Sequence, residues 1–316
     1  MVWFWRFCVF SFVGLLSSYV IASFILHDLL RSVEPETSTN TPTAFTVDSS
    51  YWHSDEVDYL LKSFEAVSFS PRSEPGLLQG WFIPASSNKV VIVVHGLASS
   101  MASAKALITA SLLHQSGFNV LLFDTRDHGS SFIEDSKTAL GTNEYLDILG
   151  AWDFLISHKQ FSAAQIGITG GSLGAVTMLI AAGEEPAIHS LFLDSPFSDH
   201  LSMIQEELSN KGYPSLLAYG GLAVSKYLYN SDLLDKPIDA AIEKSQLKRV
   251  FLTHRSQDDR ISIHHSKRIR EQLLIQDIQH DLWIVSGTGH VMSQFDYPMA
   301  YKHHLKQFFD SALSSD

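Results

Sequence analysis

Short apolar segments alternate with amphipathic stretches through most of the chain. Eight segments rich in Val, Ile, Leu and Phe have the length of strands and lack polar alternation, which is typical of strands covered on both faces. They lie at residues 66–70, 80–83, 90–94, 120–124, 166–169, 190–193, 250–253 and 282–285. Helical patterns cover residues 101–116, 143–158, 173–182, 263–274 and 297–313. This alternation predicts an α/β fold with a largely parallel sheet.

The alternation stops between residues 197 and 243. This segment is helix-like, is interrupted by Gly and Pro, and carries several large apolar side chains, namely Met203, Leu216, Leu217, Tyr219, Tyr227 and Tyr229. One interpretation is a small helical cap that shapes an apolar substrate pocket. The other is ordinary helical packing at the edge of the sheet.

The N-terminal segment has the composition of a membrane helix. Residues 7–26 carry no charge and, as a helix, would span about 30 Å, the thickness of a bilayer core. Arg6 precedes them, whereas the following flank is mostly acidic. This asymmetry predicts a single-pass anchor with its N-terminus in the cytoplasm and the main domain on the extracytoplasmic side. The alternative is a signal peptide cleaved near Ala22, which would release a secreted protein.

We therefore expect three regions. Residues 1–30 form the anchor or signal segment, and residues 31–50, rich in Ser, Thr, Pro and Glu, form a flexible polar spacer. Residues 51–316 form a single large domain. An apolar content of 45% and a charged content of 18% fit this division.

Charge and cysteine content exclude several functions. A net charge of −12 and the lack of a Lys/Arg stripe argue against nucleic-acid binding. The single cysteine, Cys8, permits neither an internal disulfide nor a thiolate metal site. Adjacent histidines at 264–265 and 303–304 lack the spacing of a helical metal site, so we expect solvated helix faces and no metal. No phosphate-binding glycine motif is present, and no cofactor is expected.

The strongest chemical signal is the segment GGSLG at residues 170–174. It lies directly between a predicted strand and a predicted helix. A serine at the tip of such a sharp turn needs neighbours without side chains, because the backbone is strained and closely packed. The free N–H groups of the following helix favour a developing negative charge. Ser172 is therefore the candidate nucleophile.

Three further motifs support a hydrolase: VVHGL at 93–97, DTRDHGSS at 124–131, and a late set with His254, Asp258, Ile261 and GTGH at 287–290. Together they resemble the alpha/beta hydrolase superfamily, nearest to its compact, serine aminopeptidase-like members, from about residue 64 onward. The resemblance implies a mostly parallel eight-stranded sheet with helices on both faces and a small cap. Asp127 stands where Gly is usual, and Ser262 where Pro often follows the acid loop, but neither is a catalytic position.

The resemblance and the order Ser, Asp, His assign the remaining catalytic roles. His290, in a Gly-flanked loop after the last strand, is the expected base for Ser172. Asp258 is favoured as the orienting acid by the spacing of the resembled motif. The adjacent Asp259 is a second candidate. Asp194 is a third, because some family members place the acid after that strand.

The expected oxyanion hole consists of the backbone N–H groups of Leu97 and Leu173. We expect cleavage of a carboxylic ester or thioester, from a small-molecule or lipid-like substrate, through an acyl-enzyme. The Tyr- and Leu-bearing cap and an anchor that would hold the enzyme near lipids favour this substrate class. An aminopeptidase-like amide hydrolase is the alternative, with Glu206 and Glu207 as candidates to bind an amino terminus. A non-catalytic binding protein on the same fold is a third interpretation. No sequence feature assigns an oligomeric state.

Overall fold

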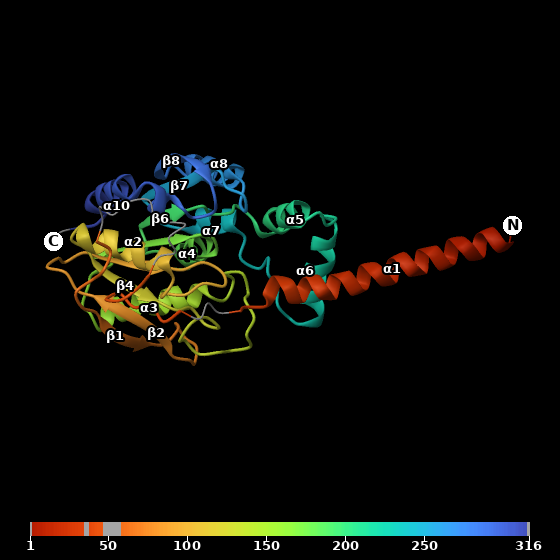
Figure 1. Ribbon diagram of the computed structural model, residues 1–316, viewed down its shortest axis with the longest axis horizontal. Helices are drawn as coiled ribbons and strands as arrows, with labels where there is room; N and C mark the ends of the chain where they lie inside the picture. Colours follow the sequence, from red (N-terminus) through yellow and green to blue (C-terminus); the bar gives the residue numbers. More distant parts are fainter. Residues whose placement is uncertain (1, 35–37, 47–57, 315–316) are drawn as a thin grey trace.

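The computed structural model describes residues 2–34, 38–46 and 58–314. Its centre is an eight-stranded sheet in the order β1-β2-β4-β3-β5-β6-β7-β8 (Figure 1). The strands are β1 (Glu65–Phe69), β2 (Leu78–Ile83), β3 (Val90–Val94), β4 (Asn119–Phe123), β5 (Ile166–Gly171), β6 (Ser190–Asp194), β7 (Arg249–Gln257) and β8 (Gln279–Thr288). β2 runs antiparallel to β1 and β4, and the pairings from β4 to β8 are parallel. The predicted eight-stranded, mostly parallel sheet is confirmed.

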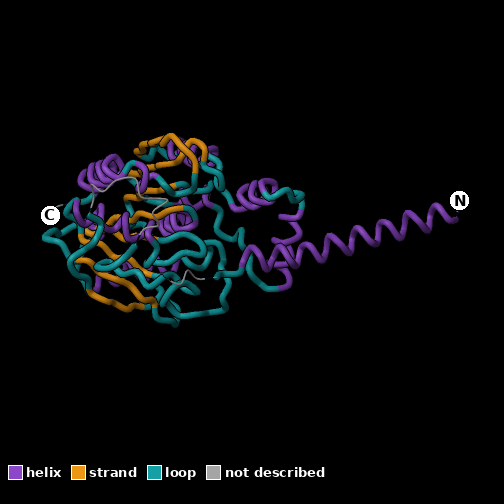
Figure 2. The backbone as a smooth tube through the Cα atoms, viewed as in Figure 1, coloured by secondary structure: helices purple, strands orange, loops and turns teal. Residues whose placement is uncertain are grey.

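Helices cover both faces of this sheet, as Figure 2 shows. They are α2 (Ala104–Gln115), α3 (Tyr145–Ser157), α4 (Leu173–Glu184), α5 (His200–Asn210), α6 (Leu217–Leu228), α7 (Ile238–Lys244), α8 (Ile263–Ile275), α9 (Ser293–Asp296) and α10 (Pro298–Ala312), with a 3-10 turn at Ala163–Gln165. Alternate residues of a strand point to opposite faces. In β3, Val90 and Ile92 join the core beneath α3, α4 and α8, whereas Val91 joins the core beneath α2 and α10.

The segment predicted as a cap divides into two parts. Helix α7 packs on α4, where Gly183 has no room for a side chain because Ala241 lies against it. Helices α5 and α6 instead stand away from the sheet, next to the end of the N-terminal helix (Figure 1). The cap is therefore built from α5 and α6, and α7 belongs to the main layer of helices.

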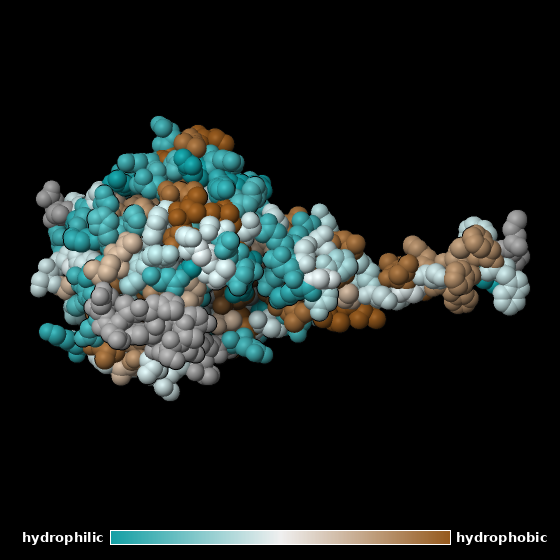
Figure 3. Space-filling model, turned by 45° about the horizontal axis from the view of Figure 1, so that its top comes forward, coloured by the Kyte–Doolittle hydropathy of each residue, from teal (hydrophilic) through white to brown (hydrophobic). Residues whose placement is uncertain are grey.

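Helix α1 (Val2–Arg31) projects from the domain over its first half (Figure 3). Within the described residues it is the one helix that is long and apolar enough to cross a membrane, which is compatible with an anchor or a signal sequence. Its last turns pack on α6.

The residues after α1 differ from the predicted flexible spacer. Ser32 forms a bridge with Lys137, the Leu61 N–H donates to the Pro42 carbonyl at 2.8 Å, and the Asn40 side chain donates to the Ala102 carbonyl at 3.3 Å. The described residues 32–34 and 38–46 therefore follow the surface of the domain. Residues 35–37 and 47–50 of the predicted spacer lie outside the described residues.

Candidate active site

Ser172 lies at the turn between β5 and α4, with backbone angles φ 55° and ψ −124°. Such a conformation is strained for a residue with a side chain and is typical of functional turns. The neighbouring glycines allow the close packing around it. A Cβ at Gly170 would lie 2.8 Å from the Val94 carbonyl oxygen, and one at Gly174 would overlap the His95 carbonyl oxygen. The Ser172 N–H donates to the Asp194 carbonyl at 2.8 Å, which fixes the turn to the next strand.

His290 and Asp258 come together from loops that follow β8 and β7. The Nδ1 atom of His290 lies 2.8 Å from Oδ2 of Asp258, whose side chain is fully buried. The other carboxylate oxygen accepts the backbone N–H groups of Arg260 and Ile261, both at 2.9 Å. The carboxylate therefore holds the ring of His290 with its proton on Nδ1, which leaves Nε2 free to accept a proton.

The environment of Asp258 keeps its carboxylate ionised. Burial alone would raise its pKa. The hydrogen bond from His290, the electrostatic attraction of that ring and the two backbone N–H donors outweigh burial, and the net result is a lowered pKa for Asp258. An ionised carboxylate is the form that stabilises a histidine cation during catalysis.

The two other acid candidates are not brought to His290. The side chain of Asp259 is exposed. Asp194 is buried beneath the turn, where its oxygens accept hydrogen bonds from the hydroxyls of Ser195 at 2.9 Å and Tyr301 at 3.1 Å. Burial raises the pKa of Asp194 to about 6.

Ser172 and His290 line one cavity of about 470 Å³, here called the histidine cavity. The loops that carry them touch, because a Cβ at Gly171 would lie 2.8 Å from the side chain of Val291. Nε2 of His290 is buried and makes no hydrogen bond to a described residue, so Ser172 and His290 are not yet bonded to each other. Catalytic hydrogen bonds of this kind are commonly long before substrate binds.

The backbone of Leu97 lies across from the serine turn. A Cβ at Gly96, the preceding residue, would come within 3.5 Å of the Ser172 side chain. The Leu97 N–H makes no hydrogen bond to any residue that the structure describes. Leu173 is the first residue of α4, so its N–H has no partner within the helix. Both predicted oxyanion donors are thus available beside Ser172.

Two buried histidines hold this loop in place. His95 accepts the Thr125 N–H at Nε2, at 3.1 Å, and lies 2.8 Å from the Gly96 carbonyl through Nδ1. His128 accepts the Ala98 N–H at 3.3 Å. Burial lowers the pKa of His95 to about 3, so the ring stays neutral and can accept. These hydrogen bonds position the loop that carries Leu97.

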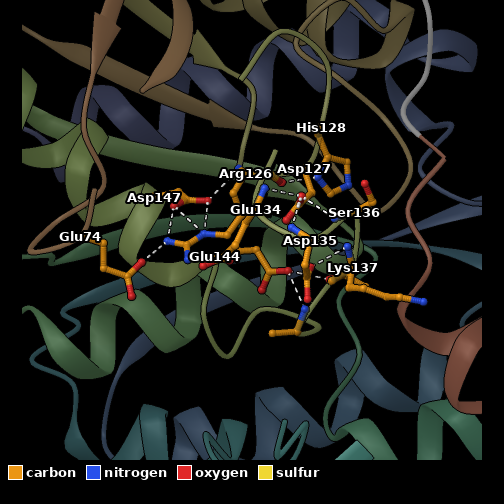
Figure 4. A network of polar contacts seen from close by, with 12 residues as sticks. Glu74, Arg126, Asp127, His128, Glu134, Asp135, Ser136, Lys137, Glu144 and Asp147 are labelled. Carbon is orange, nitrogen blue, oxygen red and sulfur yellow. Dashed lines mark hydrogen bonds and ion pairs between the residues drawn. The ribbon is translucent and has the colours of Figure 1, made fainter. Parts of the chain in front are cut away.

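The departure at Asp127 has a structural reason. Its φ is 60°, the left-handed region where Gly is common, and its Oδ1 accepts three consecutive N–H groups of residues 134–136 at 2.8–3.1 Å. Beside it, Arg126 forms hydrogen bonds of 2.7–3.2 Å to Asp147, which is fully buried, and an ion pair with Glu74 (Figure 4). Carboxylates thus hold both residues of this motif.

The expectation of solvated histidine pairs is wrong for one member of each pair. His265 is buried, where Nδ1 lies 2.9 Å from the Ser198 hydroxyl and Nε2 lies 3.1 Å from Glu206. His304 is half-buried, and its ring lies 4.5 Å from that of Trp283. His264 and His303 are exposed. Adjacent residues point to different sides of a helix, so one can be buried while the other is solvated.

A second cavity, of about 290 Å³, is also lined by Ser172. We call it the leucine cavity because Leu26, Leu29, Leu30, Leu97, Leu140, Leu173 and Leu208 line it. Ser172, Leu97 and Arg260 line both cavities. Ser172 therefore borders two cavities.

Lys105 is a residue of this site that the sequence analysis did not identify. This side chain lines the histidine cavity and donates from Nζ to the carbonyl oxygen of His290 at 2.8 Å. Burial lowers the pKa of Lys105. Nothing in the spacing of helix residues 101–116 marks Lys105 as a contact of a loop that is 185 residues away.

A sequence model of the prolyl oligopeptidase family matches residues 106–316. The chain belongs to this family. The predicted membership in the alpha/beta hydrolase superfamily, with its serine hydrolases, is thereby confirmed.

The names of two curated proteins with similar sequences state no activity. The chain is 29% identical over 168 residues to the uncharacterized protein YfhR of Escherichia coli K12. The matched region covers 50% of this chain and 56% of YfhR. The chain thus spans about half the length of that relative. It is 25% identical over 295 residues to the uncharacterized protein YqkD of Bacillus subtilis, covering 92% of this chain and 85% of YqkD.

Solved structures agree on the fold. The esterase Pf2001 of Pyrococcus furiosus superimposes with a TM-score of 0.67 and 21% identity, over 90% of this chain and all of that one. Dipeptidyl peptidase 4 of Porphyromonas gingivalis gives a TM-score of 0.59 at 18% identity, over 79% of this chain and 35% of that one. An esterase and a peptidase therefore share this fold, and the fold alone does not select between ester and amide cleavage.

Proposed function

We propose that this chain is a membrane-anchored serine hydrolase that cleaves carboxylic esters or thioesters through an acyl-enzyme. The observation that carries this proposal is the buried pair of Asp258 and His290, joined at 2.8 Å, in the cavity that also holds Ser172 on its strained turn. A carboxylate, an imidazole and a hydroxyl in this order form the proton relay of a serine hydrolase.

The reaction begins at His290, whose Nδ1 carries the proton and whose Nε2 is free to accept one. Its Nε2 takes the proton of the Ser172 hydroxyl as Oγ bonds to the substrate carbonyl carbon. The N–H groups of Leu97 and Leu173 stabilise the resulting oxyanion. The bond to the leaving alcohol or thiol then breaks, and the leaving group takes the proton from His290. Water repeats the sequence on the acyl-enzyme and releases a carboxylic acid and free Ser172.

The charges around the serine favour an ester over a peptide with a free amino terminus. The acidic side chains that line the two cavities are Asp194 and Glu207. Asp194 accepts two hydroxyl hydrogen bonds, and Glu207 is paired with Lys211 at 3.1 Å. Glu206, the other candidate for an amino terminus, is paired with His265. Lys105 and Arg260 line the same space and would repel an amine.

Amide hydrolysis is the second candidate, and the match to the prolyl oligopeptidase family is the observation that favours it. A substrate panel separates the two. The purified full-length chain should hydrolyse p-nitrophenyl esters with a kcat/KM far above that for aminoacyl p-nitroanilides. Amide turnover well above ester turnover would reverse the order of the two candidates.

The same panel tests whether the chain is an enzyme at all. A fluorophosphonate probe should label the wild type and fail to label Ser172→Ala, and this variant should lose about 10⁶ in kcat. No labelling of a folded wild type would favour a non-catalytic binding protein on this fold. Labelling that persists in Ser172→Ala would place the reactive nucleophile at another residue.

We also propose that α1 remains as a single-pass anchor with the catalytic domain on the extracytoplasmic side. Trp3 and Trp5 lie at the free end of the helix, 84% and 69% exposed, where indole rings favour the membrane interface. Membrane fractionation with N-terminal sequencing tests retention, and protease protection in sealed vesicles tests orientation. A mature N-terminus near residue 23 would contradict the anchor.

A further inference from the structure

Helix α6 is apolar on both of its faces. Its inner face is buried and consists of small and apolar residues, namely Ala218, Gly220, Gly221, Leu222, Val224 and Ser225. On its outer face Tyr219, Tyr227 and Leu228 are 58%, 76% and 63% exposed. Its single charged residue, Lys226, is paired with Asp232 at 2.6 Å. A helix that is apolar all round is typical of a protein core or a membrane, and water is a poor environment for this outer face.

The inner face of α6 is fitted to the end of α1. A Cβ at Gly220 would overlap the hydroxyl of Ser23, and one at Gly221 would lie 3.0 Å from Leu26. Nδ1 of His27 lies 2.7 Å from the Ser225 hydroxyl. Small residues that let two helices approach closely are typical of contacts within membranes. The end of α1 is thus a structural part of the cap and not a free tether.

The same part of α1 builds the wall of the leucine cavity. Leu26, Leu29 and Leu30 line this cavity together with Phe197, Met203 and Ile204 from the cap side. Ser172 and Leu173 line the same cavity. Leu29 is 71% exposed although it lines the cavity, so the cavity opens to the surface beside this residue.

The opening lies close to the expected membrane surface. If the uncharged residues 7–26 span the bilayer core, Leu29 is three residues, or about 4.5 Å, beyond it. The headgroup layer of a leaflet is roughly 5–7 Å thick, so Leu29 lies within it. Exposed tyrosines lie beside the end of the uncharged run: Tyr219 precedes Gly220, which packs against Ser23, and Tyr229, just after α6, stacks on His27 with ring centroids 4.2 Å apart. Tyrosine is enriched at this depth in membrane proteins.

We infer that the enzyme takes its substrate from the bilayer in which it is anchored, and that this substrate is a long-chain acyl ester. The acyl chain enters beside Leu29, lies between α1 and α5 in the leucine cavity, and presents its carbonyl carbon to Ser172. The outer face of α6 rests in the membrane interface. This inference rests on the proposed serine hydrolase function and assigns its substrate class.

A chain-length series tests the acyl site. Each methylene that enters an apolar site contributes up to about a fourfold gain in kcat/KM, which follows from the free energy of burying a methylene group. Leu29→Trp narrows the opening and, by displacing two methylenes, should lower the ratio of dodecanoyl to acetyl ester kcat/KM by roughly 15-fold. Ile25→Trp is the matched control, since Ile25 is also exposed on α1 but does not line either cavity. An unchanged ratio in Leu29→Trp, or an equal fall in both variants, would overturn the acyl site.

A vesicle experiment tests the route of entry. The full-length enzyme is reconstituted in phosphatidylcholine vesicles, and a dodecanoyl ester of a fluorescent alcohol is placed in the same vesicles or in separate ones. Hydrolysis should be at least about tenfold faster when enzyme and ester share a bilayer, because a lipid-like ester leaves a membrane slowly. Equal initial rates would mean that substrate arrives through water and would overturn the proposal.

Two further results separate the possible failures. Absence of both acetyl ester hydrolysis and fluorophosphonate labelling would contradict the proposed function itself, whereas an active enzyme with equal vesicle rates contradicts only the membrane route. A second copy of the chain could also cover α6. Co-purification of two differently tagged copies that Tyr227→Glu abolishes would place a partner on that face and overturn its contact with the membrane.

Discussion

Replacement of Asp258 by asparagine should remove most of the catalysis and leave the fold in place. The side chain of Asp258 is fully buried, with Oδ2 at 2.8 Å from Nδ1 of His290 and Oδ1 on two backbone N–H groups. Asparagine can keep the two backbone contacts through its carbonyl oxygen. Its NH₂ group would then point at Nδ1 as a donor, and His290 would have to carry its proton on Nε2.

The size of the effect follows from this change of tautomer. A histidine protonated on Nε2 cannot accept the proton of Ser172, and the equivalent change in another serine hydrolase costs about 10⁴ in kcat. That factor corresponds to about 5.5 kcal/mol of transition-state stabilisation. Asp259→Asn is the matched control, because this neighbour is exposed and should change kcat by less than about twofold.

The difference in stability between the wild type and Asp258→Asn should depend on pH in a defined direction. The pKa of Asp258 is lowered in the folded chain because the donors around its carboxylate outweigh its burial. A lowered pKa contributes stability that is present above the ordinary value near 3.9 and is lost as the pH falls below it. The wild type should therefore exceed the variant in free energy of unfolding at pH 7, and this advantage should shrink below about pH 4.

Initial rates with p-nitrophenyl acetate and urea unfolding of each variant provide the test. The assignment is refuted if Asp258→Asn keeps more than about a tenth of the wild-type kcat. It is also refuted if Asp259→Asn loses as much. An unfolded Asp258→Asn would contradict the expectation that the fold stays in place.

Three other substitutions, one of them with a control variant, test the surroundings of the site. Lys105→Met removes the donor to the His290 carbonyl and should lower kcat about 10-fold or more with little change in melting temperature, measured by steady-state kinetics. Asp147→Asn leaves the buried Arg126 without its main partner and should cost about 3–5 kcal/mol in urea unfolding, whereas Glu134→Gln, at an exposed partner, should cost under about 1 kcal/mol. Burial raises the pKa of Asp194 to about 6. Between about pH 4 and pH 6 the folded chain therefore keeps a proton on this carboxyl group that the unfolded chain has released, and the free energy of unfolding falls as the pH rises through this range. Asp194→Asn should remove about 3 kcal/mol of this dependence, measured as unfolding free energies at pH 4 and pH 7.

The sheet and the serine turn could be predicted because their signals are local. A strand buried on both faces needs an unbroken apolar run, as in β3, and a strained turn against neighbouring carbonyl groups needs glycines, as at Gly170 and Gly174. The pairing of Asp258 with His290 required the resembled motif as well, because Asp258 and Asp259 are adjacent and differ only in the direction of their side chains.

Contacts between distant segments left no such signal. Leu26 and Leu29 read as part of an apolar membrane helix, and the run itself does not show that α6 and the leucine cavity meet them. Lys105 and His265 are likewise explained only by partners far along the chain. Burial of a polar side chain depends on such partners, and the helical spacing records only the direction in which it points.

The most direct test of the proposed site is a crystal structure of the chain after reaction with a long-chain alkyl phosphonate. We expect phosphorus bonded to Oγ of Ser172, one phosphonyl oxygen within about 2.7–3.1 Å of the backbone nitrogens of Leu97 and Leu173, and the alkyl chain beside Leu29 and Met203. An adduct on another side chain, or an oxygen turned away from both nitrogens, would contradict the assignment of the catalytic residues.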